Sequence, residues 1–367
     1  FVFREENMSS IRAEEGPVAV TGESGYVGAH VVAVLLRRGY QVRACVTDMN
    51  NPDKTEHLLS MNEQGLKGSV ELFSANLLEE GSYDDVFNDA TAVLHVGTPM
   101  GYGNVNNPQE VYDGAIQGTN NVLNSIKKAG TVKRLIYTSS FAAIGHPAEP
   151  GYRFSEKDWA SDNRENDPNW NLDNLNEKGE VGYAMAKVEL EHLVNRVAEE
   201  DGRFDSISVC PIVVLGPLLS KAHELVGSWQ WYLGRLLGGK ICKRGYQHLW
   251  NIVDVRDVAE SQALMLESDV CQNGYRYQLS ATDGSGELSV PEIKTHLESL
   301  YPDFLIGSPP DEINAILDKH GQVFQSPLAH CDKARSELGL QTHPVRDTLR
   351  DTAESLLKLG LVEPRSR

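Results

Sequence analysis

The sequence predicts an α/β protein of the Rossmann type, in which a doubly wound parallel sheet is joined to a smaller C-terminal α/β substrate lobe. Three observations predict it. Short apolar runs alternate with helix-compatible segments, and this alternation requires parallel strands joined by crossover helices. A glycine-rich loop follows the first run, and small polar residues follow several of the others. A chain of 367 residues is long enough for such a sheet and an added lobe.

The first predicted strand and its loop carry the sharpest signal. Residues 18–20 are an apolar run typical of a strand buried on both faces. Gly22, Gly25 and Gly28 follow at a spacing that permits a sharp turn, close approach to a phosphate and tight packing of the next helix, predicted at 29–38. The same glycine spacing also occurs in ordinary strand-to-helix turns that bind no cofactor. The strand before and the helix after favour a dinucleotide site, where the first amides of the helix attract a pyrophosphate.

The remaining elements follow the same alternation. Further strands are predicted at 41–46, 70–73, 92–96, 132–138 and 207–214, with helices at 82–88, 111–129 and 181–200. After these the pattern loosens into the lobe, with helices at 225–237 and 290–300, a strand-to-helix segment at 251–266, and short elements at 275–279 and 332–338. Asp254 or Asp257 suits the N-cap of the helix that ends at Leu266.

The predicted domain organisation has three parts. Residues 1–16 are an N-terminal extension that we expect to lie outside the fold, and residues 17–216 form the dinucleotide-binding domain. Residues 217–367 form mainly the substrate lobe, with 251–266 returning to the dinucleotide-binding domain. The cleft between lobe and sheet is the expected substrate pocket.

Composition excludes several classes of partner. The formal net charge of −18 disfavours nucleic acid and anionic membrane surfaces. No apolar run approaches the roughly 20 residues that span a bilayer, and no apolar signal core lies near the start. The chain opens at Phe1, so either it has been processed or Met8 begins the natural product. We expect a cytoplasmic protein without a metal site, because its cysteines lack the spacing of zinc or redox motifs. The five are Cys45, Cys210, Cys242, Cys271 and Cys331.

The end of the second predicted strand falls where this fold meets the adenine ribose. Asp48 there favours a free 2′-hydroxyl, as in NAD, whereas Arg43 and Lys54 favour the 2′-phosphate of NADP. These residues alone leave both cofactors open. His95, inside an apolar strand, is predicted to be a packed core histidine and not a catalyst.

Three residues suggest proton-transfer chemistry. Tyr183 and Lys187 lie four residues apart on a predicted helix, so both side chains project from one face. A free phenol has a pKa of about 10, and a neighbouring ammonium lowers it by stabilising the phenolate. Ser140, at a strand end, can donate a hydrogen bond to a substrate oxygen. Tyrosine and lysine at this spacing also occur by chance, but the glycine loop upstream and the serine between favour a catalytic set.

Taken in order, these motifs resemble a known superfamily. The stretch 21–28, Thr138-Ser-Ser140 and Tyr183-x-x-x-Lys187 are similar to those of extended short-chain dehydrogenases/reductases. The chain is most similar to the dihydroflavonol reductase-like branch, which includes cinnamoyl-CoA reductases and aldehyde and ketone reductases. Further matching stretches lie at 95–100, 132–140, 211–217 and 253–258. The resemblance implies an NAD(P)H-dependent reductase of an aldehyde or ketone.

The resemblance also implies a role for each residue. Tyr183 would be the general acid, Lys187 would hold the nicotinamide ribose and tune Tyr183, and Ser140 would polarise the carbonyl. Thr98 would lie near that ribose, and residues 211–214 would line the nicotinamide. The branch usually uses NADPH, and we favour NADP over NAD. The expected cofactor contacts are Gly22, Ser24, Gly25, Tyr26, Val27, Gly28, Thr47, Asp48, Lys54, Asn76, Leu77, Val96, Gly97, Thr98, Thr138, Tyr183, Lys187, Pro211, Ile212, Val213 and Val214.

Departures from the branch bear on the substrate. Gly145 stands where plant flavonoid reductases have asparagine, and Thr47 stands where they have arginine. The cinnamoyl-CoA reductase signature before Lys187 is absent. Asn76 replaces an aspartate that reads the adenine amino group, although its side-chain carbonyl can accept the same bond. Neither plant substrate is therefore assumed.

Two other functions stay open at this point. A hydroxysteroid dehydrogenase or a sugar-nucleotide epimerase or dehydratase would share the fold, but sugar-nucleotide enzymes usually have asparagine at the position of Val213. The second is a non-catalytic dinucleotide-binding scaffold, which the intact Ser140, Tyr183 and Lys187 disfavour. The expected partner is a small carbonyl compound or alcohol, and the chain is expected to act as a monomer or homodimer.

Overall fold

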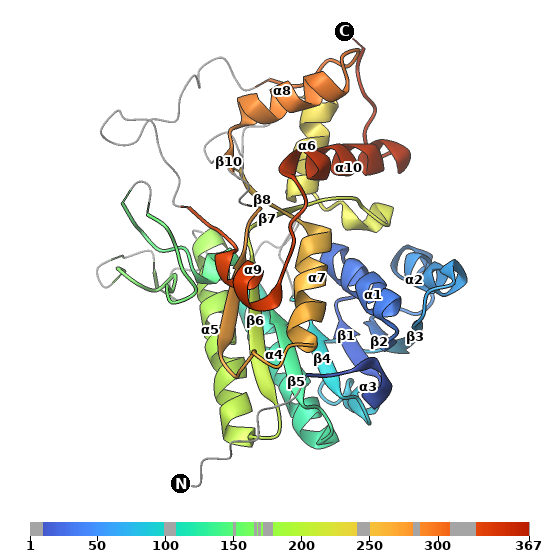
Figure 1. Ribbon diagram of the computed structural model, residues 1–367, viewed down its shortest axis with the longest axis vertical. Helices are drawn as coiled ribbons and strands as arrows, with labels where there is room; N and C mark the ends of the chain where they lie inside the picture. The colour runs from blue at the N-terminus through green and yellow to red at the C-terminus, as the bar shows by residue number, and fades with distance from the viewer. Residues whose placement is uncertain are drawn as a thin grey trace.

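A seven-stranded parallel sheet forms the centre of the molecule (Figure 1). The computed structural model describes residues 10–98, 108–149, 152–164, 167, 170–171, 179–240, 250–281, 287–308 and 328–366. The strand order is β3-β2-β1-β4-β5-β6-β9. Their bounds are β1 Val18–Thr21, β2 Gln41–Val46, β3 Ser69–Ser74, β4 Ala92–His95, β5 Arg134–Thr138, β6 Asp205–Pro211 and β9 Tyr275–Leu279. The predicted fold class is confirmed, and the order reverses between β1 and β4, where such sheets bind ligands.

Helices cover both faces of this sheet (Figure 1). On one face α1 (Tyr26–Arg38) packs against α7 (Val255–Leu266), beside α2 (Pro52–Leu59) and α9 (Asp332–Leu338). On the other face lie α3 (Asp84–Phe87), α4 (Pro108–Ala129) and α5 (Gly179–Asp201). Because the central strands are buried on both sides, their residues are apolar almost without alternation.

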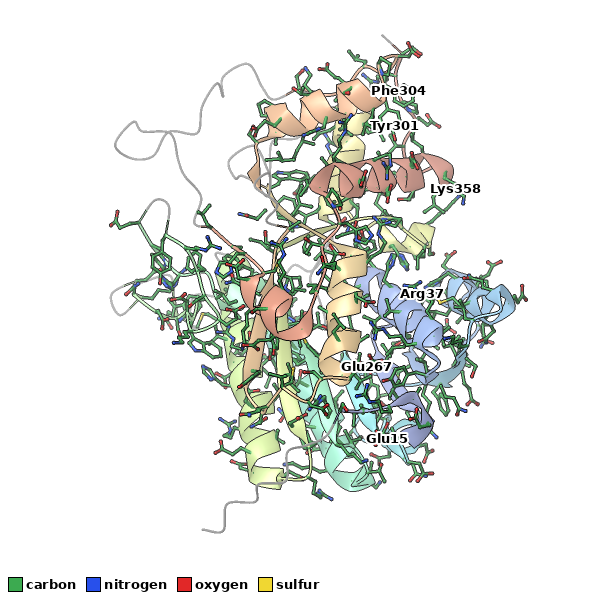
Figure 2. All side chains as sticks on the ribbon, viewed as in Figure 1. Glu15, Arg37, Glu267, Tyr301, Phe304 and Lys358 are labelled. Carbon is green, nitrogen blue, oxygen red and sulfur yellow. The ribbon has the colours of Figure 1, made fainter. Side chains whose placement is uncertain are left out.

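A smaller lobe lies beyond the carboxyl ends of the strands, at the top of Figure 1. Its sheet has the order β10-β8-β7 and is covered by helices α6, α8 and α10. Tyr301 and Phe304 stack at its far end, with ring centroids 5.2 Å apart (Figure 2). The bounds are β7 Val213–Leu215, β8 Trp250–Asp254, β10 Glu287–Leu288, α6 Trp229–Leu237, α8 Val290–Leu300 and α10 Val345–Lys358.

Two sheet assignments differ from the sequence prediction. Residues 275–279, assigned to the lobe, form β9 at the edge of the central sheet, where they pair in parallel with β6. The predicted strand 207–214 is two strands, because the chain leaves β6 after Pro211 and Val213 pairs with Ile252 of the lobe. Both errors have one cause: a short apolar run identifies a strand but does not say which sheet receives it.

The chain before β1 also differs from the expectation that it lies outside the fold. Ile11 is fully buried in the core. Its N–H donates to the carbonyl of Leu266 at 3.0 Å, and its own carbonyl accepts from the Tyr40 hydroxyl at 2.8 Å. One apolar residue in a charged segment gives no periodicity, so the sequence offers no sign of this packing.

Two composition-based expectations can be compared with the described residues. Cys45, Cys210, Cys271 and Cys331 are buried, and none of them forms a disulfide within the described residues; Cys242 lies outside those residues. Within the described parts of the chain, no helix combines the length and the apolar character needed to span a bilayer.

Candidate active site

The glycine loop lies where the carboxyl ends of β1 and β4 meet. Gly22 has φ +73°, which favours glycine, and a Cβ there would lie 2.3 Å from the Cα of Gly97, so no side chain fits at this position. A Cβ on Gly28 would lie 2.2 Å from the carbonyl oxygen of Gly22, which explains the close packing of α1 on the loop. Helix α1 begins at Tyr26 without a side-chain cap. Its first amides therefore suit a phosphate, and the loop fits a dinucleotide.

Glu23, inside this loop, is a feature that the sequence analysis missed. Its side chain is fully buried, and among the described residues neither carboxyl oxygen has a side-chain hydrogen-bond partner, although the backbone N–H groups of Ser24 and Cys45 lie near enough to oppose part of the effect of burial. Burial raises the pKa of Glu23 to about 8, because the charged form loses its hydration. The loop therefore holds a carboxyl group that is mostly protonated at neutral pH.

The end of β2 gives a partial correction of the ribose prediction. Lys54 donates from Nζ to the hydroxyl of Thr47 at 2.7 Å, which places this cation at the end of β2. Asp48 accepts from the N–H of Asn50 at 3.0 Å and is exposed. Arg43 instead points toward α3, where it donates to the carbonyls of Val86 and Asn88. Its guanidinium is thus engaged away from the strand end, and the argument from Arg43 for a 2′-phosphate is wrong.

The predicted adenine contacts lie at the end of β3. The Asn76 side-chain carbonyl accepts from the N–H of Leu78 at 3.1 Å, and its amide donates to Glu79 at 3.3 Å. Leu77 packs against Gly118 of α4. The Asn76 side chain therefore shapes the turn after β3, and its predicted adenine contact stays a prediction.

Lys187 connects the strand ends on the other side of the reversal. Only 2% of the residue is exposed, and its ammonium donates to the Thr98 hydroxyl at 2.9 Å and to the Thr138 carbonyl at 3.0 Å. The Tyr137 hydroxyl lies 3.4 Å from the same nitrogen. Burial lowers the pKa of Lys187 to about 8, while the nearby Glu191 charge opposes that shift. At neutral pH the ammonium therefore remains mostly charged.

Tyr183 and Ser140 flank this lysine. The Lys187 nitrogen lies 5.8 Å from the centre of the Tyr183 ring, one helical turn away on α5, and Tyr183 is half-buried. Ser140 follows β5 two residues after Thr138, and its Oγ accepts from the N–H of Ala142 at 3.1 Å. This bond leaves the hydroxyl proton of Ser140 available for another acceptor. The structure thus brings the three predicted residues to the ends of neighbouring elements, with the ammonium beside the phenol.

The predicted nicotinamide segment runs from the last residue of β6 into β7. Beyond it the chain is tied to α1: Tyr26 donates from its hydroxyl to the Gly216 carbonyl at 2.8 Å, and His30 Nε2 lies 2.9 Å from the Pro217 carbonyl. The Tyr26 hydroxyl is therefore already engaged, and the predicted phosphate contact of Tyr26 would have to use its backbone N–H. His95 is buried, with Nδ1 2.6 Å from the Thr21 hydroxyl, and burial lowers its pKa to about 3, as a neutral core histidine requires.

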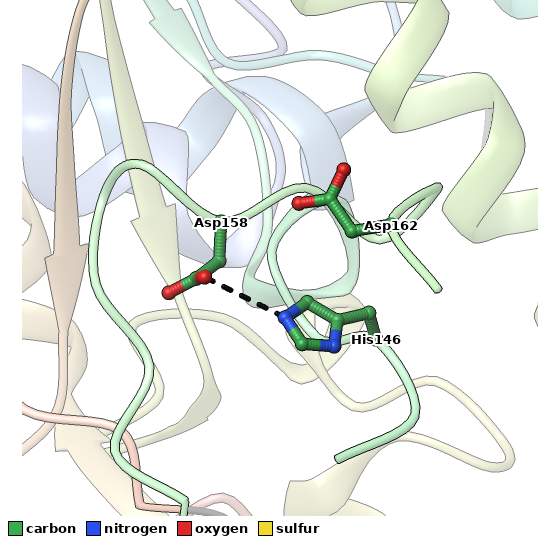
Figure 3. Close-up of side chains that lie close together, drawn as sticks. All are labelled: His146, Asp158 and Asp162. Carbon is green, nitrogen blue, oxygen red and sulfur yellow. Dashed lines mark ion pairs between the residues drawn. The ribbon is translucent and has the colours of Figure 1, made fainter. Parts of the chain in front are cut away.

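One group of side chains has the composition of a metal site. Potential ligand atoms of His146, Asp158 and Asp162 lie within 4.8 Å of one another (Figure 3). Asp158 already accepts hydrogen bonds from Tyr152 and Ser155, and Asp162 accepts from the N–H of Trp159. These bonds fold residues 152–164 upon themselves, which accounts for the cluster without an ion.

The fold and this site together define a nicotinamide-dinucleotide oxidoreductase of the short-chain dehydrogenase/reductase type. Residues 18–279 match the NAD dependent epimerase/dehydratase family, and the chain belongs to that family. It is similar to cinnamoyl-CoA reductase CAD2 of Medicago truncatula, with 31% identity over 92% of this chain and 95% of the relative. Tetraketide alpha-pyrone reductase 1 of Arabidopsis thaliana is 29% identical over 94% of this chain and 97% of its own length.

The solved structures agree on the fold. Gre2 of Candida albicans in complex with NADPH superposes with a TM-score of 0.73 at 23% identity, covering 94% of this chain and 99% of that one. The relatives are reductases, and the chain is an NAD(P)-dependent oxidoreductase that acts on carbonyl groups.

Proposed function

We propose that this protein reduces a small aldehyde or ketone with NADPH, with Tyr183 as the proton donor. The observation that carries the proposal is the buried Lys187 ammonium, held by Thr98 and Thr138 next to the Tyr183 ring. A fixed positive charge there stabilises the phenolate that remains after proton transfer. When bound, the nicotinamide supplies the hydride to the carbonyl carbon.

Each residue of the site then has a definite task. Tyr183 gives its hydroxyl proton to the carbonyl oxygen, so that the carbonyl becomes an alcohol. Ser140 donates a hydrogen bond to the same oxygen as its negative charge develops. Lys187 keeps the phenol acidic, and Thr98 holds Lys187 in place. Gly22, with the uncapped start of α1, supports the phosphates.

The choice of NADPH over NADH is supported by Lys54. It lies at the end of β2, partly exposed, and donates to Thr47. Its ammonium can move onto a 2′-phosphate at little cost, because both it and Thr47 face water there. Asp48 beside it disfavours the same phosphate, so we expect a preference for NADPH that is measurable but modest.

The test is the oxidation of NADPH by the purified chain with a panel of aliphatic and aromatic aldehydes and ketones. We expect turnover with some of them, faster with NADPH than with NADH, and loss of turnover in Ser140→Ala. Absence of turnover across a broad panel would favour a non-catalytic scaffold. A sugar-nucleotide epimerase would convert its substrate without net consumption of NADPH, so product analysis with uridine diphosphate sugars separates that alternative.

We also propose that the protein works as a monomer or homodimer in a reducing compartment such as the cytoplasm. The four buried cysteines of the described chain form no disulfide there, which supports the compartment. Sedimentation equilibrium of the purified chain would decide the oligomeric state, and a tetramer would contradict the proposal.

A further inference from the structure

Directly behind the candidate site lies a buried ion pair that no part of the proposed reaction uses. Glu191 is one turn beyond Lys187 on α5 and is fully buried. Its Oε2 accepts from Nε of Arg276 at 2.6 Å, and Arg276 comes from β9 at the edge of the central sheet. The other oxygen, Oε1, accepts from the hydroxyl of Ser139 at 2.5 Å. Glu191 therefore connects the helix that carries Tyr183 and Lys187 to the residue preceding Ser140.

Arg276 extends the connection to the turn that follows Ser140. It donates from Nη2 to the carbonyl of Ala143 at 3.2 Å, in the short helix η3 (Phe141–Ala143) that Ser140 caps. Nη1 donates to the carbonyls of Glu156 and Asp158 at 3.1 and 2.8 Å. Its guanidinium also lies 3.7 Å from the Trp159 ring centre. The Arg276 guanidinium thus binds backbone carbonyls that follow Ser140 in the chain, at Ala143, Glu156 and Asp158.

Stability is a weak reason for such a pair. Desolvating two charges costs about as much as their attraction returns, so a buried ion pair often adds little to the free energy of unfolding. What this pair does supply is geometry. The residue before Ser140 is Ser139, which is hydrogen-bonded to Glu191. The turn after Ser140 ends at Ala143, whose carbonyl is hydrogen-bonded to Arg276. The carboxylate also lies near the Lys187 ammonium, whose pKa it raises against the effect of burial.

We propose that Glu191 is a positioning residue which, through Ser139 and Arg276, sets the place of the Ser140 hydroxyl relative to Tyr183 and Lys187. This role rests on the proposed function of those three residues. It predicts that breaking the connection lowers the rate of the chemical step and leaves cofactor binding unchanged. A misplacement of about 1 Å at a reacting centre can cost on the order of a hundredfold in rate.

The same sheet offers a matched control at its other end. Arg134 of β5 and Asp205 of β6 form a buried, two-bond ion pair, with distances of 2.9 and 2.8 Å. Arg134 also donates to the backbone carbonyls of Met265 and Ser268. This pair resembles Glu191–Arg276 in burial and bonding, but it lies at the amino end of β5, and the bonds given above lead to Asp205, Met265 and Ser268 and not to the candidate site. Asp205→Asn therefore measures how far the loss of a buried ion pair lowers stability when the candidate site is not involved.

The experiment compares Glu191→Gln, Ser139→Ala and Asp205→Asn with the wild type. Ser139→Ala removes one hydrogen bond and leaves the ion pair, so it is the variant to use if Glu191→Gln does not fold. In Ser139→Ala, which keeps the Glu191 charge, we expect kcat to fall about a hundredfold while the Kd for NADPH, measured by fluorescence titration, stays the same. Glu191→Gln also removes a charge that raises the Lys187 pKa, so its kcat should fall at least as far. Asp205→Asn should lose thermal stability and keep its kcat per folded molecule. Unchanged kcat in both Glu191→Gln and Ser139→Ala would overturn the proposal.

A readout without turnover separates this proposal from the proposed function. Crystal structures of the wild type and Ser139→Ala should show the Ser140 hydroxyl displaced relative to Tyr183 in the variant. The comparison is valid even if the wild type reduces no carbonyl in the panel, which would contradict only the proposed function. If Ser140 keeps its position in Ser139→Ala, Glu191 does not position it.

Discussion

Two fully buried glutamates, one in each half of the site, show how differently the halves are built. Glu191, in the half formed by β4, β5, β6 and α5, accepts from Ser139 and Arg276. Glu23, in the half formed by β1, β2 and β3, has no side-chain partner among the described residues, and only backbone N–H groups lie near its carboxyl. Both side chains are equally inaccessible to water. The difference therefore lies in their partners and not in their burial.

This contrast extends to the neighbouring residues. In the chemical half, Lys187 already bonds to Thr98 and Thr138, so its ammonium has its place before any ligand arrives. In the nucleotide half, α1 begins without a side-chain cap and Lys54 holds only an exposed hydroxyl. Preorganised charge is most valuable where charge develops during the reaction. The uncapped backbone amides of α1 and the exposed Lys54 ammonium suit the half that is expected to bind the phosphates of the cofactor.

The strongest test of the chemical half is Tyr183→Phe. This substitution removes the proposed proton donor, so reduction should fall by up to about ten-thousandfold. Cofactor affinity should stay the same, because the ring and the Lys187 bonds to Thr98 and Thr138 remain. Steady-state kinetics and fluorescence titration with NADPH measure the two effects. An equal loss of NADPH binding would contradict the assigned role.

The buried carboxyl of Glu23, in the nucleotide half, should make the free energy of unfolding depend on pH. The pKa of Glu23 is about 8 in the fold against an ordinary value of 4.5, so between these values the folded chain holds a proton that the unfolded chain releases. The free energy of unfolding should therefore decrease as pH rises through this window, by on the order of 5 kcal/mol from this group. Glu23→Gln cannot ionise and should flatten the profile.

Urea unfolding of the wild type and Glu23→Gln at pH 5 and pH 8 measures this difference. Both proteins should have similar stability at the lower pH, and the variant should be the more stable at the higher. If the two profiles keep the same slope, a donor pairs with Glu23 in solution and the contrast with Glu191 disappears.

Lys187→Ala should affect both halves, but less than the loss of the phenol. Removal of the ammonium leaves Tyr183 with a higher pKa, and we expect about a hundredfold lower kcat. NADPH should also bind more weakly, because the lysine is expected to hold the nicotinamide ribose. The same kinetic and binding measurements apply. A fall in kcat with full cofactor affinity would restrict Lys187 to tuning Tyr183.

Local spacing made the core of this site predictable, and long-range pairing did not. Gly22 and the pair Tyr183 and Lys187 are recognisable because a turn or one helical face fixes their geometry. Glu191 lies one turn further along the same helical face, so its place on the helix can be predicted from the spacing. Its partner Arg276 cannot, because it is 85 residues away in the sequence, on a strand that the sequence prediction assigns to the lobe instead of the central sheet. The prediction that Arg43 favours a 2′-phosphate fails for a related reason, because the face of the sheet toward which a strand side chain points decides its partners.

The smallest effect is expected at the end of β2, where the nucleotide half meets water. Thr47→Arg adds a second cation beside Lys54, at the strand end where we expect the 2′-phosphate to bind. An exposed ion pair contributes up to about 1 kcal/mol, so the ratio of kcat/KM for NADPH to that for NADH should rise by about fivefold. Thr47→Gln, of similar length but uncharged, is the control and should leave the ratio unchanged. An unchanged ratio in Thr47→Arg would mean that the ribose is read elsewhere, and that this exposed end of β2 does not belong to the nucleotide half.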